Sequence, residues 1–354
     1  MSRFFSEKYK NLTPYTPGEQ PRDAQYIKLN TNESPFPPSE RAQAAASEAA
    51  AKLHLYCDPT CRALHALMAE RLGVSVEEVL ATNGSDEILN FAFMAFCDEK
   101  TPAIFPDITY GFYEVYAELH GIPYEKKPLD GDFRIRVEDY CQNNATVFIA
   151  NPNAPTGIAL TREEIERILQ ANPDHVVVID EAYVDFGAQS CVPLIRTYPN
   201  LLVTQTFSKS RSMAGARLGM GIACADLIAD LCALKYSTNP YNVNGMTQAA
   251  GIGVLSDEDY TRRNCQTVAE NREYLAAELA KMGFESTPSQ ANFVFTRHPC
   301  VAGEEIYRRL REKGILVRHF TAPRIKDYNR ITVGALADMQ TLVATLQEIL
   351  EETL

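Results

Sequence analysis

The stretch Thr204-Gln-Thr-Phe-Ser-Lys-Ser-Arg-Ser-Met-Ala-Gly-Ala-Arg-Leu-Gly219 follows an apolar run, Leu201-Leu-Val203, and places Lys209 among small hydroxylic residues. The run is typical of a buried strand, so we expect Lys209 just past a strand end, where α/β sheets present ligands. A lysine amine held there can form a Schiff base with an aldehyde cofactor if its surroundings lower its pKa. Thr206, Ser208 and Arg217 could bind a phosphate on that cofactor. A lysine in a serine-rich loop is more often only a solvated charge, so the choice between these two interpretations depends on the rest of the chain.

Length and composition limit the class of protein. At 354 residues the chain exceeds the ~250 to 300 residues at which single hydrophobic cores usually divide, so two unequal domains are expected. We predict an N-terminal arm over 1–40 that joins the smaller domain, a large domain over 41–250 and a small domain over 251–354. The net charge of -12 argues against a nucleic-acid or anionic-membrane partner.

The cysteines and the N-terminal residues point to a cytoplasmic protein. The nine cysteines are an odd number without CxxC pairs, which is typical of reduced thiols. Cys57 and Cys61 lie four residues apart, but no matching pair follows them, so no metal site is expected. The first ten residues lack the apolar core of a signal peptide, and no run of about 18 apolar residues occurs.

Along the chain, residues 11–38 carry too many prolines for a helix or a central strand and predict an extended arm. A helical pattern follows over 39–55, and a second one runs through Leu64, Leu67, Met68 and Leu72. After a turn at Gly84 a third pattern covers 88–96, with Ser85 or Asp86 as the expected cap. The free N–H groups of that last helix end could hold phosphate. Apolar runs then alternate with helical patterns, which predicts an α/β fold with a mostly parallel sheet. The runs lie at 103–105, 145–150, 175–179, 201–203 and 219–223.

The C-terminal part predicts a smaller α+β unit. A long helix is expected over roughly 257–282, followed by strands at 292–295, 315–317 and 330–333 that alternate with two more helices. Thr161-Arg-Glu-Glu164 is a capping-box pattern and predicts a helix start in the larger unit.

Polar clusters stand at the ends of the apolar runs, and their order carries a resemblance. They are Gly84-Ser-Asp86, Asp107-Ile-Thr-Tyr110, Asn151-Pro-Asn-Ala-Pro-Thr-Gly157, Asp180-Glu-Ala-Tyr183, Ser208-Lys209 and Arg217. The series resembles the pyridoxal-phosphate aminotransferases of fold type I over nearly the whole chain. The resemblance is closest to their histidinol-phosphate aminotransferase subgroup, because of Leu12-Thr-Pro-Tyr-Thr-Pro-Gly18, Leu29-Asn-Thr-Asn-Glu-Ser-Pro35 and Arg330-Ile-Thr-Val-Gly334. It implies a large domain with a seven-stranded, mostly parallel sheet, and pyridoxal 5′-phosphate as cofactor.

The resemblance assigns roles around the cofactor. Lys209 matches the Schiff-base lysine, which also shuttles a proton, and Asp180 matches the partner of the protonated ring nitrogen. Tyr183 would bond the ring oxygen and Tyr110 would stack on the ring. For Asp180 alone a helix cap is the ordinary interpretation, and for the tyrosines it is half-buried packing. The remaining matches are phosphate ligands, namely Ser85, Asp86, Thr206, Ser208, Arg217 and, from a neighbouring subunit, Tyr56.

The resemblance also bears on the oligomeric state, and the chain departs from the family pattern at one position. If Tyr56 reaches across, the active unit is a homodimer. The family usually has Asn directly before Pro-Thr-Gly, whereas this chain has Ala154, so Asn153 or Asn151 would have to stand in at the cofactor.

The resemblance also implies a substrate pocket. Arg330 matches a carboxylate-binding arginine, since a guanidinium suits carboxylate and phosphate alike. Arg318 and Tyr15 match positions that hold the phosphate of histidinol phosphate, and Asn32 matches an arm residue near the substrate. For Arg318 alone, a strand-edge charge that prevents aggregation is an equally good interpretation.

The implied reaction converts L-histidinol phosphate and 2-oxoglutarate to imidazole-acetol phosphate and L-glutamate in histidine biosynthesis. The nearest alternative is an aromatic amino acid aminotransferase on the same scaffold, and a further one is a decarboxylase of a phosphorylated amino acid. A ligand-sensing domain of a transcription regulator would carry a DNA-binding extension, which an acidic chain with a short arm does not suggest. A dinucleotide oxidoreductase would need GxGxxG after the first strand, which is absent.

Overall fold

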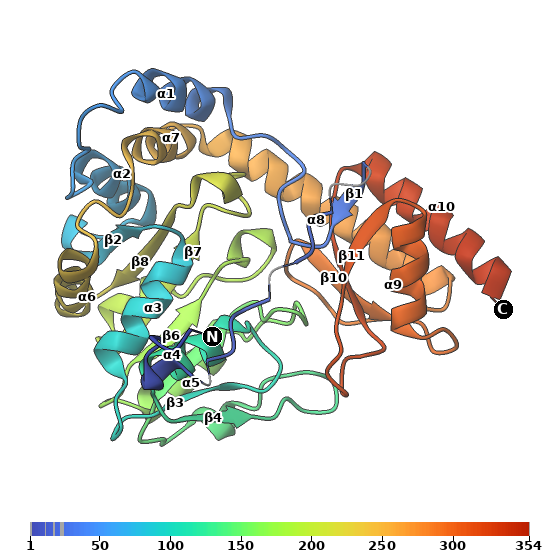
Figure 1. Ribbon diagram of the computed structural model, residues 1–354, viewed down its shortest axis with the longest axis horizontal. Helices are drawn as coiled ribbons and strands as arrows, with labels where there is room; N and C mark the ends of the chain where they lie inside the picture. The colour runs from blue at the N-terminus through green and yellow to red at the C-terminus, as the bar shows by residue number, and fades with distance from the viewer. Residues whose placement is uncertain (1, 11, 17, 22–24, 354) are drawn as a thin grey trace.

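The computed structural model describes residues 2–10, 12–16, 18–21 and 25–353, so Pro17 of the arm motif lies outside the described residues. Figure 1 shows two lobes, each built around its own sheet and joined by the long helix α8, Glu258–Lys281. Among the described residues, none of the helices has the length and apolar character needed to cross a membrane.

The larger lobe contains a seven-stranded sheet in the order β2-β8-β7-β6-β5-β3-β4. The five strands from β7 to β4 run parallel, and β8 is antiparallel to both β7 and β2, so the expected mostly parallel sheet is confirmed. The strands are β2 Val79–Thr82, β3 Ala103–Pro106, β4 Tyr124–Lys127, β5 Thr146–Ala150, β6 Val177–Asp180, β7 Leu201–Thr206 and β8 Gly219–Ala223.

Helices cover both faces of this sheet (Figure 1). Successive strand residues point to opposite faces, so in β6 Val177 and Ile179 join one apolar cluster while Val178 joins the other. This two-sided burial explains why the strands are continuous apolar runs. The helices are α1 Glu40–Ala50, α2 Arg62–Leu72, α3 Ser85–Phe96, α4 Phe112–His120, α5 Arg162–Ala171, α6 Ala225–Thr238 and α7 Gly245–Leu255.

Some expected elements differ from those observed. Strand β4 is missing from the prediction because Tyr124-Glu-Lys-Lys127 lies at the sheet edge and has no apolar run. The helix expected over 39–55 ends at Ala50, and turns follow. The expected cap of α3 is wrong: Ser85 and Asp86 are the first helical residues, and Gly84 occupies the cap position without a side-chain hydrogen bond. The capping box at Thr161 and Glu164 is confirmed.

The smaller lobe contains a five-stranded sheet in the order β1-β11-β12-β10-β9, with α8 and two further helices packed against it. Strand β1, Ile27–Leu29, comes from the arm and pairs in parallel with β11, so the arm joins this sheet. The boundary between large and small domains at residue 250 stays a prediction. The other elements are β9 Glu285–Ser286, β10 Phe293–Arg297, α9 Gly303–Glu312, β11 Ile315–His319, β12 Asn329–Thr332 and α10 Leu336–Thr353.

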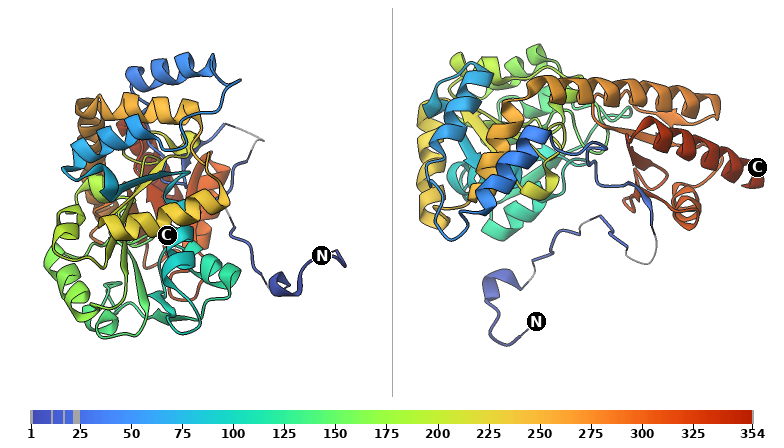
Figure 2. Two further views of the ribbon diagram at one scale, coloured as in Figure 1. Left: turned by 90° about the vertical axis from the view of Figure 1, so that its left-hand side faces the viewer. Right: turned by 90° about the horizontal axis from the view of Figure 1, so that it is seen from above.

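Figure 2 shows the first described residues extending away from both lobes. Short 3₁₀ turns connect several of the helices and strands. The turns are η1 Glu7–Tyr9, η2 Val76–Glu78, η3 Val137–Tyr140, η4 Val184–Phe186, η5 Val192–Arg196 and η6 Ala214–Ala216.

Candidate active site

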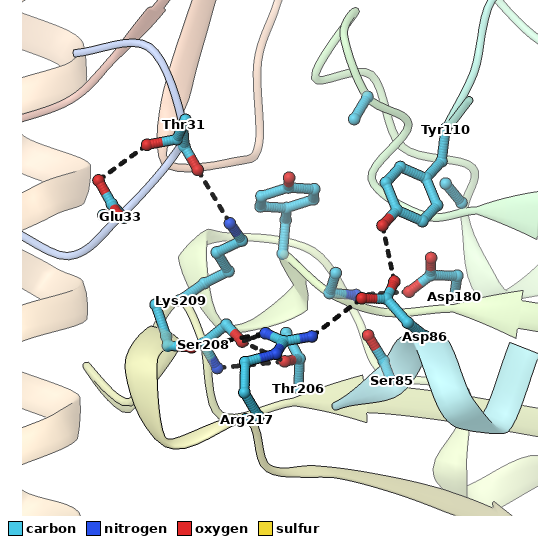
Figure 3. A pocket seen from close by; sticks show the side chains of 15 residues that line it. Thr31, Glu33, Ser85, Asp86, Tyr110, Asp180, Thr206, Ser208, Lys209 and Arg217 are labelled. Atoms are coloured by element: carbon cyan, nitrogen blue, oxygen red, sulfur yellow. Dashed lines mark hydrogen bonds and ion pairs between the residues drawn. The ribbon is translucent and has the colours of Figure 1, made fainter. Parts of the chain in front are cut away.

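A cavity of about 230 Å³ opens at the carboxyl ends of three neighbouring parallel strands (Figure 3). Ala150, Asp180 and Thr206 are the last residues of β5, β6 and β7, and all three line it. The cavity therefore has the position that ligands take in open α/β sheets. Its lining residues are Thr31, Glu33, Ser85, Asp86, Tyr110, Ala150, Ala154, Asp180, Ala182, Tyr183, Thr206, Ser208, Lys209, Ala214 and Arg217.

Lys209 is a cavity residue and not a solvated surface charge. Its Nζ donates to the backbone oxygen of Thr31 at 3.1 Å (Figure 3). It also lies 5.9 Å from the centre of the Tyr183 ring. Burial, followed by the positive charge of Arg330, lowers its pKa to about 8, while Glu33 acts in the opposite direction. An amine with this pKa is partly neutral at neutral pH and can act as a nucleophile or a base.

The Asp180 carboxyl lies buried at the floor of the cavity. One oxygen accepts a hydrogen bond from the Tyr113 hydroxyl at 3.2 Å, and the other accepts one from the Ala182 N–H at 3.2 Å. Burial, with the nearby charge of Asp86, raises its pKa to about 7. Among the described residues no cation forms an ion pair with it, so the carboxylate is suited to a positively charged ligand group.

A second set of groups around the cavity suits a phosphate (Figure 3). The N-terminus of α3 presents Ser85 and Asp86, and Arg217 donates to Asp86 at 2.9 Å and to Ser208 at 3.3 Å. Thr206 donates to the Ser208 hydroxyl at 2.9 Å. A free helix N-terminus, hydroxyls and a guanidinium together form an anion site.

A glycine makes this approach of β8 to α3 possible. A Cβ on Gly219 would lie 2.3 Å from the Ser85 nitrogen, so a side chain at this position would push the helix end away.

Two tyrosines frame the cavity. Tyr110 donates to Asp86 at 2.6 Å, and burial raises the pKa of its hydroxyl. The Tyr183 hydroxyl accepts from the Asn32 amide at 3.0 Å, which ties the arm to the loop after β6. Asn32 has a backbone φ of 56° and also bonds Thr332, so its unusual conformation is fixed by contacts on both sides.

Six predicted site residues are not among those that line the cavity, namely Tyr15, Asn32, Tyr56, Asn153, Arg318 and Arg330. Asn153 is buried, and its amide nitrogen donates to the Ile108 oxygen and to the Thr156 hydroxyl. Tyr56 is 84% exposed and stacks on Tyr241, with ring centroids 4.6 Å apart. Tyr15 stacks on Phe112 at 4.3 Å, near the start of α4.

Ala154 does line the cavity, but Asn151 does not replace the missing amide. The Asn151 side chain bonds the backbone of Leu160 through both of its polar atoms. No asparagine side chain is among the residues lining the described cavity.

Arg318 and Arg330 lie opposite each other in the antiparallel pairing of β11 and β12. Side chains of such pairs share a face, so two like charges are adjacent, which is unfavourable unless an anion binds between them. Arg330 donates to the Asn30 backbone oxygen at 3.0 Å, and its buried Nε has no hydrogen-bond partner among the described residues. Burial and the charge of Arg318 lower the pKa of Arg330.

Sequence reasoning missed three residues of the site. Thr31 and Glu33 stand beside the predicted Asn32, and the arm motif that contains all three was the available signal. Tyr113 follows Tyr110 by three residues, and nothing in the local pattern indicates that its hydroxyl reaches Asp180.

Comparisons with known proteins define the class. The family model for aminotransferase class I and II matches residues 24–349, so the chain belongs to this family of aminotransferases. It is 49% identical to the histidinol-phosphate aminotransferase of Aromatoleum aromaticum, over 99% of this chain and 100% of that protein. It is 48% identical to histidinol-phosphate aminotransferase 1 of Pseudomonas aeruginosa, over 98% of this chain and 99% of that protein.

Solved structures agree with this class. The histidinol-phosphate aminotransferase of Sinorhizobium meliloti, in complex with pyridoxal-5′-phosphate, superimposes with a TM-score of 0.85 at 26% identity over 93% of this chain and 92% of that chain. The enzyme of Clostridium acetobutylicum gives a TM-score of 0.83 at 25% identity over 92% and 99% of the two chains. The expected aminotransferase fold is confirmed.

Proposed function

We propose that this chain transfers the amino group of L-histidinol phosphate to 2-oxoglutarate, yielding imidazole-acetol phosphate and L-glutamate, in histidine biosynthesis. The observation that carries the proposal is the full-length identity of 48 to 49% to relatives named for this activity. The paired Arg318 and Arg330 support it, because they form a site for an anionic substrate group.

The cavity fits pyridoxal 5′-phosphate. Asp180 is a buried carboxyl bonded by two neutral donors, so a protonated pyridine nitrogen would supply the missing cation. Ser85, Thr206, Ser208 and Arg217 would hold the phosphate, and Tyr110 would cover the ring. When bound, the cofactor supplies an aldehyde carbon that condenses with amines and a ring that accepts electrons.

Lys209 carries the proton in this proposal. Its Nζ would take the proton from the substrate carbon that bears the amino group and pass it on to the cofactor, and in the second half-reaction it would carry a proton in the reverse direction. A pKa of about 8 suits both proton uptake and proton release, because near neutral pH the protonated and the neutral amine are both present. The Thr31 oxygen orients Nζ, and Tyr183, held by Asn32, would donate to the ring oxygen.

The substrate side is built from the small sheet and the arm. Arg330 would bind the α-carboxylate of the amino acid partner, and Arg318 with Tyr15 would bind the phosphate of histidinol phosphate. Tyr15 lies at the arm segment near α4, so the arm would complete the pocket from the large-lobe side. These roles follow from charge and position.

The active unit in this proposal is a cytoplasmic homodimer. Tyr56 is exposed beside Leu53 and Leu55, which are 61% and 65% exposed, and an apolar surface of this kind suits a protein partner. Tyr56 would reach the phosphate in the neighbouring subunit. Neither nucleic acid nor a membrane is a partner in this proposal.

The test compares amino donors. Purified protein loaded with pyridoxal 5′-phosphate is given 2-oxoglutarate with L-histidinol phosphate or with phenylalanine, and glutamate formation is followed. We expect histidinol phosphate to be the better donor by kcat/KM. A faster reaction with phenylalanine would assign the chain to the aromatic aminotransferases, and release of carbon dioxide from a phosphorylated amino acid would assign it to the decarboxylases.

A further inference from the structure

Tyr113 lies directly behind the cavity and is fully buried, with 0% of its surface exposed. It stands in the first turn of α4, three residues after Tyr110. Its hydroxyl donates to the Asp180 carboxylate at 3.2 Å. The residue does not line the cavity itself, so its action on a ligand can pass only through neighbouring side chains.

Aromatic packing fixes the Tyr113 ring. Its centroid lies 5.8 Å from those of Phe105 on β3 and Phe148 on β5, and Phe148 in turn stacks on Phe93 at 4.1 Å. These contacts hold the ring over β3 and β5, and from there the hydroxyl reaches the end of β6. A buried phenol with so little freedom places its hydroxyl without further loss of conformational entropy.

The Tyr113 ring also contacts Tyr110. The two rings are perpendicular, at 87°, with centroids 5.8 Å apart. One four-residue stretch thus supplies the side chain that covers the ligand ring and the side chain that anchors the carboxyl below it.

We propose that Tyr113 is a positioning residue for the cofactor: its hydroxyl holds the Asp180 carboxylate in the orientation that pairs with the ring nitrogen of pyridoxal phosphate. The inference rests on the proposed cofactor role of Asp180. Without this hydroxyl the carboxylate keeps only the Ala182 N–H, can rotate about its side-chain bonds, and is a weaker partner for a protonated ring.

The test uses Tyr113→Phe with Tyr116→Phe as its matched control. Tyr116 lies one turn later on the same helix, is 8% exposed, and its hydroxyl has no hydrogen bond to the residues that the structure describes. Both variants keep the ring and lose one oxygen. We expect Tyr113→Phe to raise the dissociation constant of pyridoxal phosphate about ten-fold, since a hydrogen bond to a charged group is lost.

A spectroscopic measurement separates positioning from packing. In protein reconstituted with ¹⁵N-labelled pyridoxal phosphate, the ring-nitrogen chemical shift should move toward the unprotonated value in Tyr113→Phe and stay at the wild-type value in Tyr116→Phe. In an Asp180→Ala background, Tyr113→Phe should have no further effect on the dissociation constant, because the hydrogen-bond acceptor is gone.

The outcomes are distinguishable from failure of the proposed function. If wild-type protein binds the cofactor and transaminates, but Tyr113→Phe matches Tyr116→Phe within about two-fold and in chemical shift, the inference about Tyr113 is overturned. Wild-type protein that takes up no pyridoxal phosphate would overturn the proposed function and this inference together.

Discussion

The Arg324 guanidinium lies 2.8 Å from the Asp107 carboxylate and joins the two lobes. Arg324 belongs to the segment between β11 and β12 of the small sheet, and it also donates to the backbone oxygens of Leu129 and Asp130 in the large lobe. Asp107 begins the loop that carries Tyr110 and accepts from the Leu129 N–H as well. The loop that covers the cavity is therefore anchored to the small lobe.

Replacing Arg324 should loosen this anchor. We expect Arg324→Gln to destabilise the protein by about 1 kcal/mol, measured by urea unfolding, and to raise the KM for the amino donor. The expected loss of stability is modest because the Arg324 side chain is 41% exposed, so water screens its ion pair. Arg262→Gln, which breaks an exposed pair within α8, is the control and should change stability by less than about 0.5 kcal/mol. Equal effects of the two substitutions would contradict the anchor.

Cofactor uptake should depend on the protonation of Lys209. The neutral amine is the reactive form, so the rate at which apo-protein takes up pyridoxal phosphate should rise with pH through a midpoint near 8. Visible absorbance measures this rate. Glu33→Gln should lower the midpoint and Arg330→Gln should raise it, because they remove charges of opposite sign near Nζ. Shifts in the same direction would show that these charges do not act on Lys209.

Arg318 should serve the phosphate of the donor. We expect Arg318→Gln to raise the KM for histidinol phosphate roughly 10- to 100-fold while the KM for 2-oxoglutarate changes little, because a charge-assisted bond is lost. Initial rates with histidinol, which lacks the phosphate, should be nearly unaffected. Arg308→Gln on the outer face of α9 is a matched loss of charge and should leave all three values unchanged. A similar loss of activity toward histidinol would indicate a structural role for Arg318.

His65 should make the fold sensitive to acid. Its Nε2 accepts the Ala81 N–H at 2.9 Å, and burial lowers its pKa to about 4. The unfolded histidine takes up its proton near pH 6.5, so the contribution of His65 to stability should be constant above that pH and fall between 6.5 and about 4, by up to about 3 kcal/mol. Urea unfolding across this range measures it, and the exposed His54→Gln should show the same loss as wild type, whereas His65→Gln should not.

Tyr56 should act in the neighbouring subunit. Lys209→Ala alone should be inactive, and Tyr56→Ala alone should bind the cofactor weakly. Mixed dimers should regain one intact site, which takes Lys209 from one chain and Tyr56 from the other. Cofactor titration of the mixed sample, with each pure variant as control, measures this recovery. If binding stays at the level of Tyr56→Ala, Tyr56 does not cross between subunits.

Much of the large sheet could be predicted because its strands are buried on both faces. Continuous apolar runs then mark β3, β5, β6, β7 and β8, and polar residues at their ends mark the site edge. The edge strand β4 has no such run, and β1 forms only by pairing with residues 315–317, which are distant in the chain. The orientation of the Asn153 side chain could not be predicted either, because its hydrogen-bond partners depend on how the surrounding loops fold.

The sequence alone determined the class of protein, because the order of the motifs and the periodicity of the strands are local properties. It placed Lys209 and Asp180 at strand ends, where the parallel sheet makes them neighbours. Only the tertiary structure decided that Thr31 orients Lys209 across 178 residues, that Tyr113 holds Asp180, and that Arg318 faces Arg330. Such contacts arise from strand register and helix packing, which bring together residues that no local pattern connects.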